Sequence, residues 1–307
     1  MANVTDAAFR RVIAKYGKPD VMWTEFVSCD GLCSPGRSEL LIDFKYTESE
    51  RPIIAQVFGS KPENYYQTAL LIQELGFDGV DINMGCPEKS ISGKQCSGAA
   101  LIEQPALAAE IIAATKRGAG PLPVSVKTRL GYNKNVLDTW LKQLLEAQPA
   151  AITIHARTKK EMSLVPAHWE EVAKAVAIRD AFDSSSNKTL ILGNGDVKDL
   201  PEARARVAQT GCDGVMIGRG IFGNPWLFNK ERDYRSIPME EKLAVLLEHT
   251  RLFEELLGEH KNFALMKKHY KAYVNGFDGA KELRVQLMEA EDSAGVDATI
   301  KTFLAAR

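Results

Sequence analysis

The chain has 307 residues, of which 45% are hydrophobic and 26% are charged, and its formal net charge is −1. This is the composition of an ordinary globular protein, and the length accommodates one large domain and a smaller one. The near-zero charge excludes a global basic field, so a nucleic acid would have to be bound by a local patch. No apolar run approaches the length of a membrane span, so we expect no membrane partner.

Five cysteines occur, an odd number, and no two of them form a Cys-x-x-Cys pair. Cys29 and Cys33 have no second pair downstream that would complete a zinc site. We therefore expect reduced thiols and no metal. With no signal-peptide pattern at its start, the chain is expected to be cytoplasmic.

Strand and helix patterns alternate from residue 5 to residue 218. Strands are expected at residues 20–27, 52–59, from 79 to a stop at Gly85, 123–129, 151–155, 189–193 and 214–218. Helices are expected at residues 5–17, 61–75, 104–117, 135–147, 169–180 and 198–209. This alternation is typical of an α/β protein with a parallel sheet.

The seven expected strands are one fewer than the eight that close a (β/α)8 TIM barrel. Because the chain opens with a helix, we expect the first strand to be the missing one. A doubly wound open sheet is the alternative, but no Gly-x-Gly-x-x-Gly follows an early strand. Helices expected at 239–257, 262–274, 280–290 and 297–306 form a small all-helical domain. We therefore expect a barrel domain at residues 1–237 and a helical domain at 238–307.

Polar side chains follow nearly every expected strand. Because the carboxyl ends of barrel strands carry the active site, we expect these side chains to converge on one rim. They are Glu25, Gln56, Asn83, Cys86, Lys127, Arg129, His155, Arg157, Asn194, Asp196 and Arg219. Any one of them alone, Lys127 or Asn194 for example, is as well explained as a solvated turn residue, but the recurrence after each strand favours a site.

Two glycine clusters, Gly193 to Asp196 and Gly218 to Gly220, follow the last two expected strands. Loops in these positions of a TIM barrel often bind phosphate, because glycine lets backbone N–H groups approach an anion. Arg219 would add a charged clamp, and two tight turns are the alternative. Flavin mononucleotide (FMN) fits such a site, with Lys127 and His155 beside its ring or ribityl chain and Gln56 near a ring edge.

Asn83 and Cys86 lie in the turn after the strand that begins at Gly79. The residues alone leave two readings open, a small core thiol or a reactive group, since free cysteine is among the most buried residue types. An unperturbed thiol, with a pKa of about 8.5, is mostly protonated at neutral pH, as a general acid must be.

Several motifs spread over nearly the whole chain occur together. They are Asn83-Met84-Gly85-Cys86-Pro87, Val126-Lys127-Thr128-Arg129-Leu130-Gly131, Thr153-Ile154-His155-Ala156-Arg157-Thr158, Gly193-Asn194-Gly195-Asp196-Val197 and Asn224-Pro225-Trp226. The combination resembles the tRNA-dihydrouridine synthase family. The resemblance implies an FMN-bearing barrel, a helical tRNA-binding domain and NADPH as reductant. The implied reaction is reduction of the C5–C6 double bond of particular uridines in tRNA.

The resemblance also implies roles for individual residues. Cys86 would protonate C5 of the uracil while reduced flavin delivers hydride to C6. The family's FMN contacts fall on Met1, Ala2, Gln56, Lys127, His155, Asn194, Gly195, Asp196, Gly218 and Arg219.

Contacts to the tRNA are expected in two places. Asn83 can hydrogen-bond the edge of an extruded uracil, and Lys89, Arg129 and Arg157 can meet backbone phosphates. In the helical domain a basic and aromatic surface is expected from Lys261, Lys267, Lys268, Lys271, Lys281 and Arg284, with Tyr270 and Tyr273 between them. An ordinary solvated helix face is the alternative there.

Two other functions remain open at this point. An FMN barrel reductase of a small molecule, of the dihydroorotate or enone type, would share the phosphate loops but gives no reason for the helical domain. A non-catalytic tRNA-binding protein with an open barrel is motivated by the missing strand. In each case we expect a monomer.

Overall fold

The computed structural model of the chain describes residues 1–94, 96–183, 185 and 188–307, and these form two compact units. Unit 1 consists of Met1–Glu25, Leu41–Arg51 and Gly220–Arg307, and unit 2 of Phe26–Leu40 and Pro52–Arg219. The expected boundary at residue 238 marks the change from strands to helices. The compact units divide elsewhere, because the N-terminal residues group with the C-terminal helices.

Within the described part of the chain, seven strands form one sheet in the order β1-β2-β3-β4-β5-β6-β7. They are β1 (Met22–Ser28), β2 (Ile53–Phe58), β3 (Gly79–Met84), β4 (Val124–Arg129), β5 (Ala151–His155), β6 (Leu190–Asn194) and β7 (Gly214–Met216). From β2 to β7 each strand pairs in parallel with the next one along the chain. A doubly wound sheet reverses its strand order at a switch point, and this sheet has none, so the predicted seven-stranded TIM-barrel fold is confirmed.

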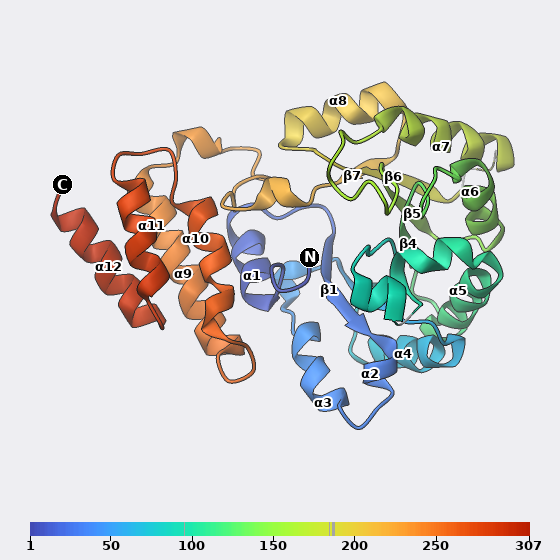
Figure 1. The fold of residues 1–307 in the computed structure, drawn as a ribbon, viewed down its shortest axis with the longest axis horizontal. Coiled ribbons are helices and arrows are strands. Elements are labelled where there is room, and N and C mark those ends of the chain that lie inside the picture. The colour runs from blue at the N-terminus through green and yellow to red at the C-terminus, as the bar shows by residue number, and fades with distance from the viewer. Residues whose placement is uncertain (95, 184, 186–187) are drawn as a thin grey trace. The chain divides into compact units, whose positions relative to one another are not determined.

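The strands alternate with helices in unit 2, and Figure 1 shows α5 to α8 in succession beside β4 to β7. Two helices begin at a proline, which suits the first helical position, and α8 is capped by Asp199, whose Oδ1 accepts from Glu202 N at 2.8 Å. The helices are α2 (Cys29–Leu32), α3 (Arg37–Leu40), α4 (Pro62–Glu74), α5 (Pro105–Ala119), α6 (Leu137–Glu146), α7 (Trp169–Phe182) and α8 (Leu200–Thr210).

Strand β3 is buried along its whole length. Val80, Ile82 and Met84 are each fully buried, which is the pattern of a parallel strand covered on both faces. Asp81 is also fully buried, although it carries a carboxyl group. A carboxyl group at the centre of such a strand needs polar partners, and Gln56 and Ser125 on the neighbouring strands supply them.

Unit 1 contains α1 (Ala7–Tyr16), α9 (Met239–Leu257), α10 (Lys267–Tyr273), α11 (Ala280–Glu289) and α12 (Ser293–Ala305). The last helix begins earlier than expected, because Asp292 caps it by accepting from Gly295 N at 2.7 Å. The helix expected at 262–274 is a short 3-10 turn followed by α10. Apolar faces of these helices form one core that includes Trp226, Leu246 and Phe253.

Tyr270 and Tyr273 belong to this core and are fully buried. The expectation that they lie between the lysines on an aromatic surface is therefore wrong. With Met266 and His269 they occupy the inward face of α10, at the spacing of three and four residues that a helix repeats. Among the described helices, none is long and apolar enough to cross a membrane.

Candidate active site

The turn after β3 carries Cys86 at a partly buried position. Asn83 closes this turn, because its Oδ1 accepts from Gly85 N at 3.1 Å and from Cys86 N at 2.9 Å. The Cys86 carbonyl accepts from Ala99 N at 3.0 Å, and a Cβ at Gly98, which has a φ of 57°, would lie only 3.0 Å from that carbonyl oxygen. Burial raises the pKa of the Cys86 thiol, so the thiol keeps its proton at neutral pH.

Asn83 is held by Gln56, and Gln56 is held in turn by Asp81. Its Nδ2 donates to Gln56 Oε1 at 3.1 Å, and Gln56 Nε2 donates to Asp81 Oδ2 at 2.6 Å. The other oxygen of Asp81 accepts from Ser125 Oγ at 2.6 Å. Burial raises the pKa of Asp81, although the hydrogen bonds from Ser125 and Gln56 oppose that shift.

Lys127 lies on β4 beside Asn83 in the sheet register. Its Nζ donates to Asn194 Oδ1 at 3.2 Å, and Asn194 Nδ2 donates to the Met216 carbonyl at 2.8 Å. Burial, and then the neighbouring Arg129, lower the pKa of Lys127 to about 8. The ammonium group is therefore largely charged at pH 7 and ties the ends of β4 and β6 together.

His155 at the end of β5 is neutral. Burial lowers its pKa to about 2, and the cations Lys127, Arg129, Arg157 and Arg219 lower it further in the same direction. Arg157 Nη1 lies 3.2 Å from His155 Nε2, and since a guanidinium only donates, that ring nitrogen accepts. The ring proton therefore resides on Nδ1.

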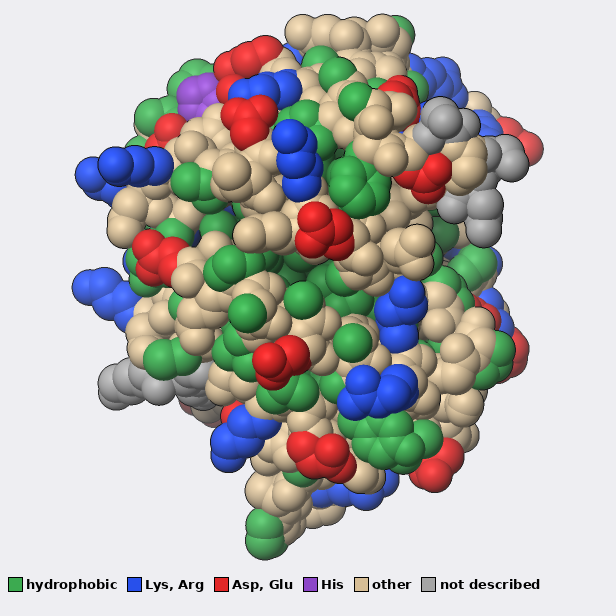
Figure 2. Space-filling model, turned by 90° about the vertical axis from the view of Figure 1, so that its right-hand side faces the viewer, with side chains coloured by type: hydrophobic (Ala, Val, Ile, Leu, Met, Phe, Trp, Pro, Cys, Tyr) green, Lys and Arg blue, Asp and Glu red, His purple; other side chains and the backbone are tan. Residues whose placement is uncertain are grey.

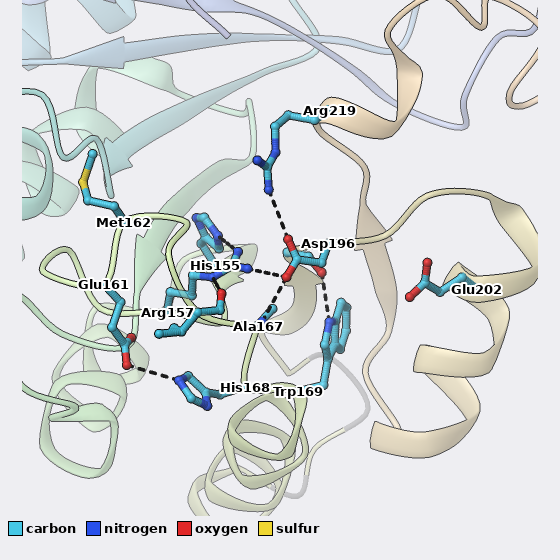
Figure 3. A network of polar contacts seen from close by, with 12 residues as sticks. His155, Arg157, Glu161, Met162, Ala167, His168, Trp169, Asp196, Glu202 and Arg219 are labelled. Atoms are coloured by element: carbon cyan, nitrogen blue, oxygen red, sulfur yellow. Dashed lines mark hydrogen bonds and ion pairs between the residues drawn. The ribbon is translucent and has the colours of Figure 1, made fainter. Parts of the chain in front are cut away.

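Two arginines reach the Asp196 carboxylate from different sides (Figure 3). Arg157 Nη2 bonds Oδ2, and Arg219 Nη2 lies 3.1 Å from Oδ1. Ala167 N also donates to Oδ2 at 3.0 Å, and these contacts hold the pKa of Asp196 below its usual value against the opposing effect of burial. Asp196 adopts a positive φ of 54°, so this arrangement is built on an uncommon backbone conformation.

Arg129 and Arg157 give their donors to the protein itself. Arg129 Nε donates to the Gly85 carbonyl at 2.8 Å, and its Nη1 donates to the Thr158 carbonyl at 3.0 Å. Arg157 Nε donates to the Val165 carbonyl at 2.6 Å, besides its bonds to His155 and Asp196. Both side chains are buried, so in this structure they brace the rim loops.

The two glycine clusters differ in the space around their backbone. At Gly218 a Cβ would meet no atom within 4 Å, and the neighbouring Arg219 side chain is 66% exposed. Gly195 has a φ of 133°, and a Cβ there would lie 2.8 Å from Ala167 Cβ. The backbone at Gly218 is therefore accessible to a ligand, and the position of Gly195 requires glycine.

A cavity of about 460 Å³ adjoins the loop that Arg129 braces. Thr158, Glu161, His168 and Glu171 line it together with Lys134, Lys160, Leu130, Asn133 and Asn135. Glu161 accepts from Thr158 N at 2.7 Å and lies 3.1 Å from His168 Nε2. Neither Cys86 nor Asn83 lines the cavity. Thr158 does line it, and the Thr158 carbonyl is the one that Arg129 bonds.

Most of the remaining expected contacts belong to unit 1, and Lys89 belongs to unit 2, three residues after Cys86. Met1 and Ala2 belong to unit 1, where the Met1 amino group donates to Thr5 Oγ1 at 2.7 Å. Lys89 is exposed, as is Lys268. Lys267 Nζ donates to the Met288 carbonyl at 2.6 Å, and Arg284 Nη1 to the Val274 carbonyl at 2.7 Å. Glu25, expected at the rim, and Lys261, expected on the basic face, form an ion pair within unit 1 at 3.1 Å.

Sequence reasoning missed Asp81 and Ser125. The sequence did contain an indication, because Asp81 lies in the middle of the apolar run Gly79 to Met84. A carboxyl group buried in such a strand needs a hydrogen-bond partner. Which neighbour supplies that partner follows from the sheet register, which pairs Asp81 with Gln56 on one side and Ser125 on the other.

A family model described as dihydrouridine synthase matches residues 1–306. The chain belongs to the dihydrouridine synthase family. The resemblance drawn from the sequence motifs is thereby confirmed. A "Probable tRNA-dihydrouridine synthase" of Staphylococcus aureus (strain COL) is 42% identical over 307 residues, which covers 99% of this chain and 91% of that protein. A "Probable tRNA-dihydrouridine synthase 2" of Bacillus subtilis (strain 168) is also 42% identical, covering 99% of this chain and 92% of the relative.

Solved structures similar to this dihydrouridine synthase family member share its fold at low sequence identity. Morphinone reductase gives a TM-score of 0.54 at 13% identity and covers 75% of this chain and 81% of its own. A 6-hydroxypseudooxynicotine amine oxidase from Pseudomonas geniculata N1 gives 0.54 at 13% identity, covering 84% of this chain and 51% of its own. These likenesses concern the barrel and carry no argument about substrate.

Proposed function

We propose that this member of the dihydrouridine synthase family reduces uridines in tRNA to dihydrouridine. Family membership over residues 1–306 and the similarity to relatives named as probable tRNA-dihydrouridine synthases support the reaction. The observation that carries the mechanism is the Cys86 thiol, which stands on a braced turn at a strand end with its pKa raised by burial. A thiol that stays protonated can give its proton to C5 as hydride arrives at C6, and the thiolate then recovers a proton from water.

The cofactor we propose is FMN, and the residues at the strand ends fit it. An accessible glycine backbone at Gly218, the exposed Arg219 and the charged Lys127 suit a phosphate and an electron-rich ring. When bound, the flavin supplies the hydride, and NADPH is the proposed source of its electrons. The residues proposed to hold it are Met1, Ala2, Gln56, Lys127, His155, Asn194, Gly195, Asp196, Gly218 and Arg219.

The neutral state of His155 supports its place in this set. With Nε2 accepting from Arg157, the ring offers an N–H donor at Nδ1 and no charge. Lys127 offers the positive charge close by. The two side chains would therefore orient a ligand in different ways, His155 by a directional hydrogen bond and Lys127 by charge.

Binding of tRNA requires the target uridine to leave its base stack. We propose that the exposed Lys89 contacts phosphate beside the Cys86 turn and that Arg129 and Arg157 shape the loops around it, since their donors are already used by the protein. Residues 238–307 are proposed as a second tRNA contact through Lys267, Lys268 and Arg284. A uracil contact by Asn83 stays a prediction, because both groups of its amide bond the protein.

The test follows the flavin. The bound flavin is reduced without oxygen, tRNA lacking dihydrouridine is added, and the return of flavin absorbance is recorded. We expect rapid reoxidation by tRNA and none by uracil, orotate or simple enones. Reoxidation only by one of these small molecules would replace the proposal with a small-molecule reductase.

Two variants test the acid. Cys86→Ala should keep the flavin and lose reoxidation by tRNA by about 100-fold or more, the usual scale for removing a general acid. Cys96→Ala is the matched control, because Cys96 is exposed on the loop that follows the same strand and should retain full activity. An unchanged rate for Cys86→Ala would rule out the acid assignment.

A further inference from the structure

A row of polar side chains crosses the sheet below the Cys86 turn. The register pairs Gln56 of β2 with Asp81 of β3 and Asp81 with Ser125 of β4. Residues two apart on a strand face the same way, so Asn83 shares the face of Asp81. All four side chains therefore lie on one face of the sheet, and hydrogen bonds connect them in series toward the Cys86 backbone.

We propose that Asp81 is a positioning residue for Cys86, acting through Gln56 and Asn83. The proposal rests on the proposed function of Cys86 as the acid. Asp81 is fully buried, and the hydrogen bonds that lead from it to Cys86 run through the amides of Gln56 and Asn83. Its charge also acts on Lys127, and an Asp81→Asn variant separates that effect from the hydrogen bond.

The direction of each amide follows from the two ends of this series. Gly85 N and Cys86 N can only donate, so the Asn83 atom that they meet must be oxygen and the amide nitrogen must face Gln56. Gln56 then presents its oxygen to Asn83 and its nitrogen to Asp81. At the far end, an Asp81 oxygen accepts from the Gln56 nitrogen. The acceptor at Asp81 and the two backbone donors at Gly85 and Cys86 therefore require the same orientation of both amides.

Removing the acceptor at Asp81 would release this constraint. Gln56 could then rotate its amide, and an Asn83 turned with it would present N–H groups to the N–H groups of Gly85 and Cys86. The turn would lose its closing hydrogen bonds, and the Cys86 sulfur would lose its fixed place. A displacement of about 1 Å at a reacting group costs on the order of 100-fold in rate.

A hydrophobic residue at position 81 would fit the buried strand without needing hydrogen-bond partners. The neighbours Val80, Ile82 and Met84 show that the interior of β3 is otherwise apolar, and burying a carboxyl group there is unfavourable unless it is hydrogen-bonded. Asp81 meets its two partners at 2.6 Å each, one of them leading to Cys86 and the other, Ser125, leading away from it. This asymmetry provides a matched control on the same carboxylate.

The experiment compares three variants of the full-length protein loaded with flavin. Asp81→Leu has the same branched shape without the acceptor, Asp81→Asn keeps an acceptor for Gln56, and Ser125→Ala removes the other hydrogen bond. Hydrogen exchange at the amides of Gly85 and Cys86 reports the turn. Reoxidation of reduced flavin by saturating tRNA, with the KM for tRNA, reports the consequence for the reaction.

For Asp81→Leu we expect at least tenfold faster exchange at both amides and a 10- to 100-fold slower reoxidation at saturating tRNA, with the KM within twofold. Asp81→Asn and Ser125→Ala should stay within about threefold of the unmodified protein in both measurements. If Asp81→Leu does not fold, Asp81→Ala, which adds no bulk, replaces it. Equal effects of Asp81→Leu and Ser125→Ala, or no rescue by Asp81→Asn, would overturn the proposal.

The two proposals fail in different ways. If Cys86→Ala retains full activity, the acid assignment fails, while the exchange at Gly85 and Cys86 still decides whether Asp81 holds the turn. If Asp81→Leu leaves both the exchange and the rate unchanged while Cys86→Ala is inactive, the acid assignment stands and the positioning role is lost.

Discussion

Polar side chains in the sheet and rim loops of unit 2 are hydrogen-bonded, whereas the buried histidines in the helical core of unit 1 are held by ring contacts. In unit 2 the buried side chains of Asp81 and Arg157, and Asp196 on the rim, each meet two or more hydrogen-bond partners. In the helical core His249 and His269 stack edge to face with their ring centroids 4.7 Å apart. Neither His249 nitrogen has a hydrogen-bond partner among the described residues.

This difference teaches what each region can tolerate. Hydrogen-bonded charges at the strand ends fix positions to within the accuracy that chemistry needs, and they lose stability when a partner is removed. The helical core is held by shape and tolerates the histidines only while they are neutral. The predictions below test each side of this comparison, beginning with the largest expected effect.

Arg157→Met should lower the free energy of unfolding by about 3 kcal/mol, because it removes a buried guanidinium that donates to the Val165 carbonyl and to the Asp196 carboxylate. Arg219→Met removes the other partner of the same carboxylate, but its side chain is exposed and should cost about 1 kcal/mol or less. Urea unfolding of both variants measures the difference. Equal losses would mean that burial does not distinguish the two arginines.

Lys261→Met should lower the free energy of unfolding by about 3 kcal/mol, since it leaves two carboxylates unpaired in unit 1. Lys261 Nζ lies 3.1 Å from Glu25 Oε2 and 2.6 Å from Asp43 Oδ1, and all three side chains are largely buried. Lys268→Met is the control, because Lys268 is exposed and should change stability by less than about 0.5 kcal/mol. If Lys261→Met lost tRNA affinity without losing stability, Lys261 would belong to the tRNA-binding surface expected from the sequence.

Acid should destabilise unit 1 through its histidines. Burial lowers the pKa of His249 well below its usual value and that of His269 to about 4, so the folded state disfavours protonation. Stability present above pH 6.5 is therefore lost as the pH falls below that value, by about 1.4 kcal/mol per pH unit for each histidine until its folded pKa is reached. Asp6 acts in the opposite sense, because burial raises its pKa to about 6 and its protonation favours the folded state.

His249→Phe separates these contributions, since Asp6 is common to both proteins. The variant should lose about 1 to 1.4 kcal/mol less than the unmodified protein between pH 7.5 and pH 5.5, as measured by urea unfolding at each pH. A parallel pair of stability curves would show that His249 is protonated in the folded state at no cost.

The sequence predicted the strand ends well because apolar strands and the polar residues after them form a strong local pattern. It could place Cys86, Lys127, His155 and Asn194 on one rim from that pattern alone. It could not determine which groups the Arg157 guanidinium bonds. The Val165 carbonyl and the Asp196 carboxylate come close to it only once the loops have folded.

Two errors have the same physical origin. On α10 the side chains of Lys267, Lys268 and Lys271 alternate with Tyr270 and Tyr273, and a seven-residue helix is too short for its pattern to settle which face is buried. The burial of Lys261 likewise depends on Glu25, which is far away in the sequence. In both cases the burial of the side chain depends on residues that are distant in the sequence.

The smallest expected effects concern tRNA itself. Lys89→Ala and Lys268→Ala each remove an exposed lysine, one beside the Cys86 turn and one on the helical region. Each should weaken tRNA binding by about threefold and reduce the slope of log affinity against log salt by about 0.7 to 0.9, the value of one phosphate contact. Lys301→Ala is the control, since Lys301 pairs with Asp297 on α12 and should leave the slope unchanged. If Lys89 changes the slope and Lys268 does not, the proposed second contact through residues 238–307 is wrong, and the helical core serves stability alone.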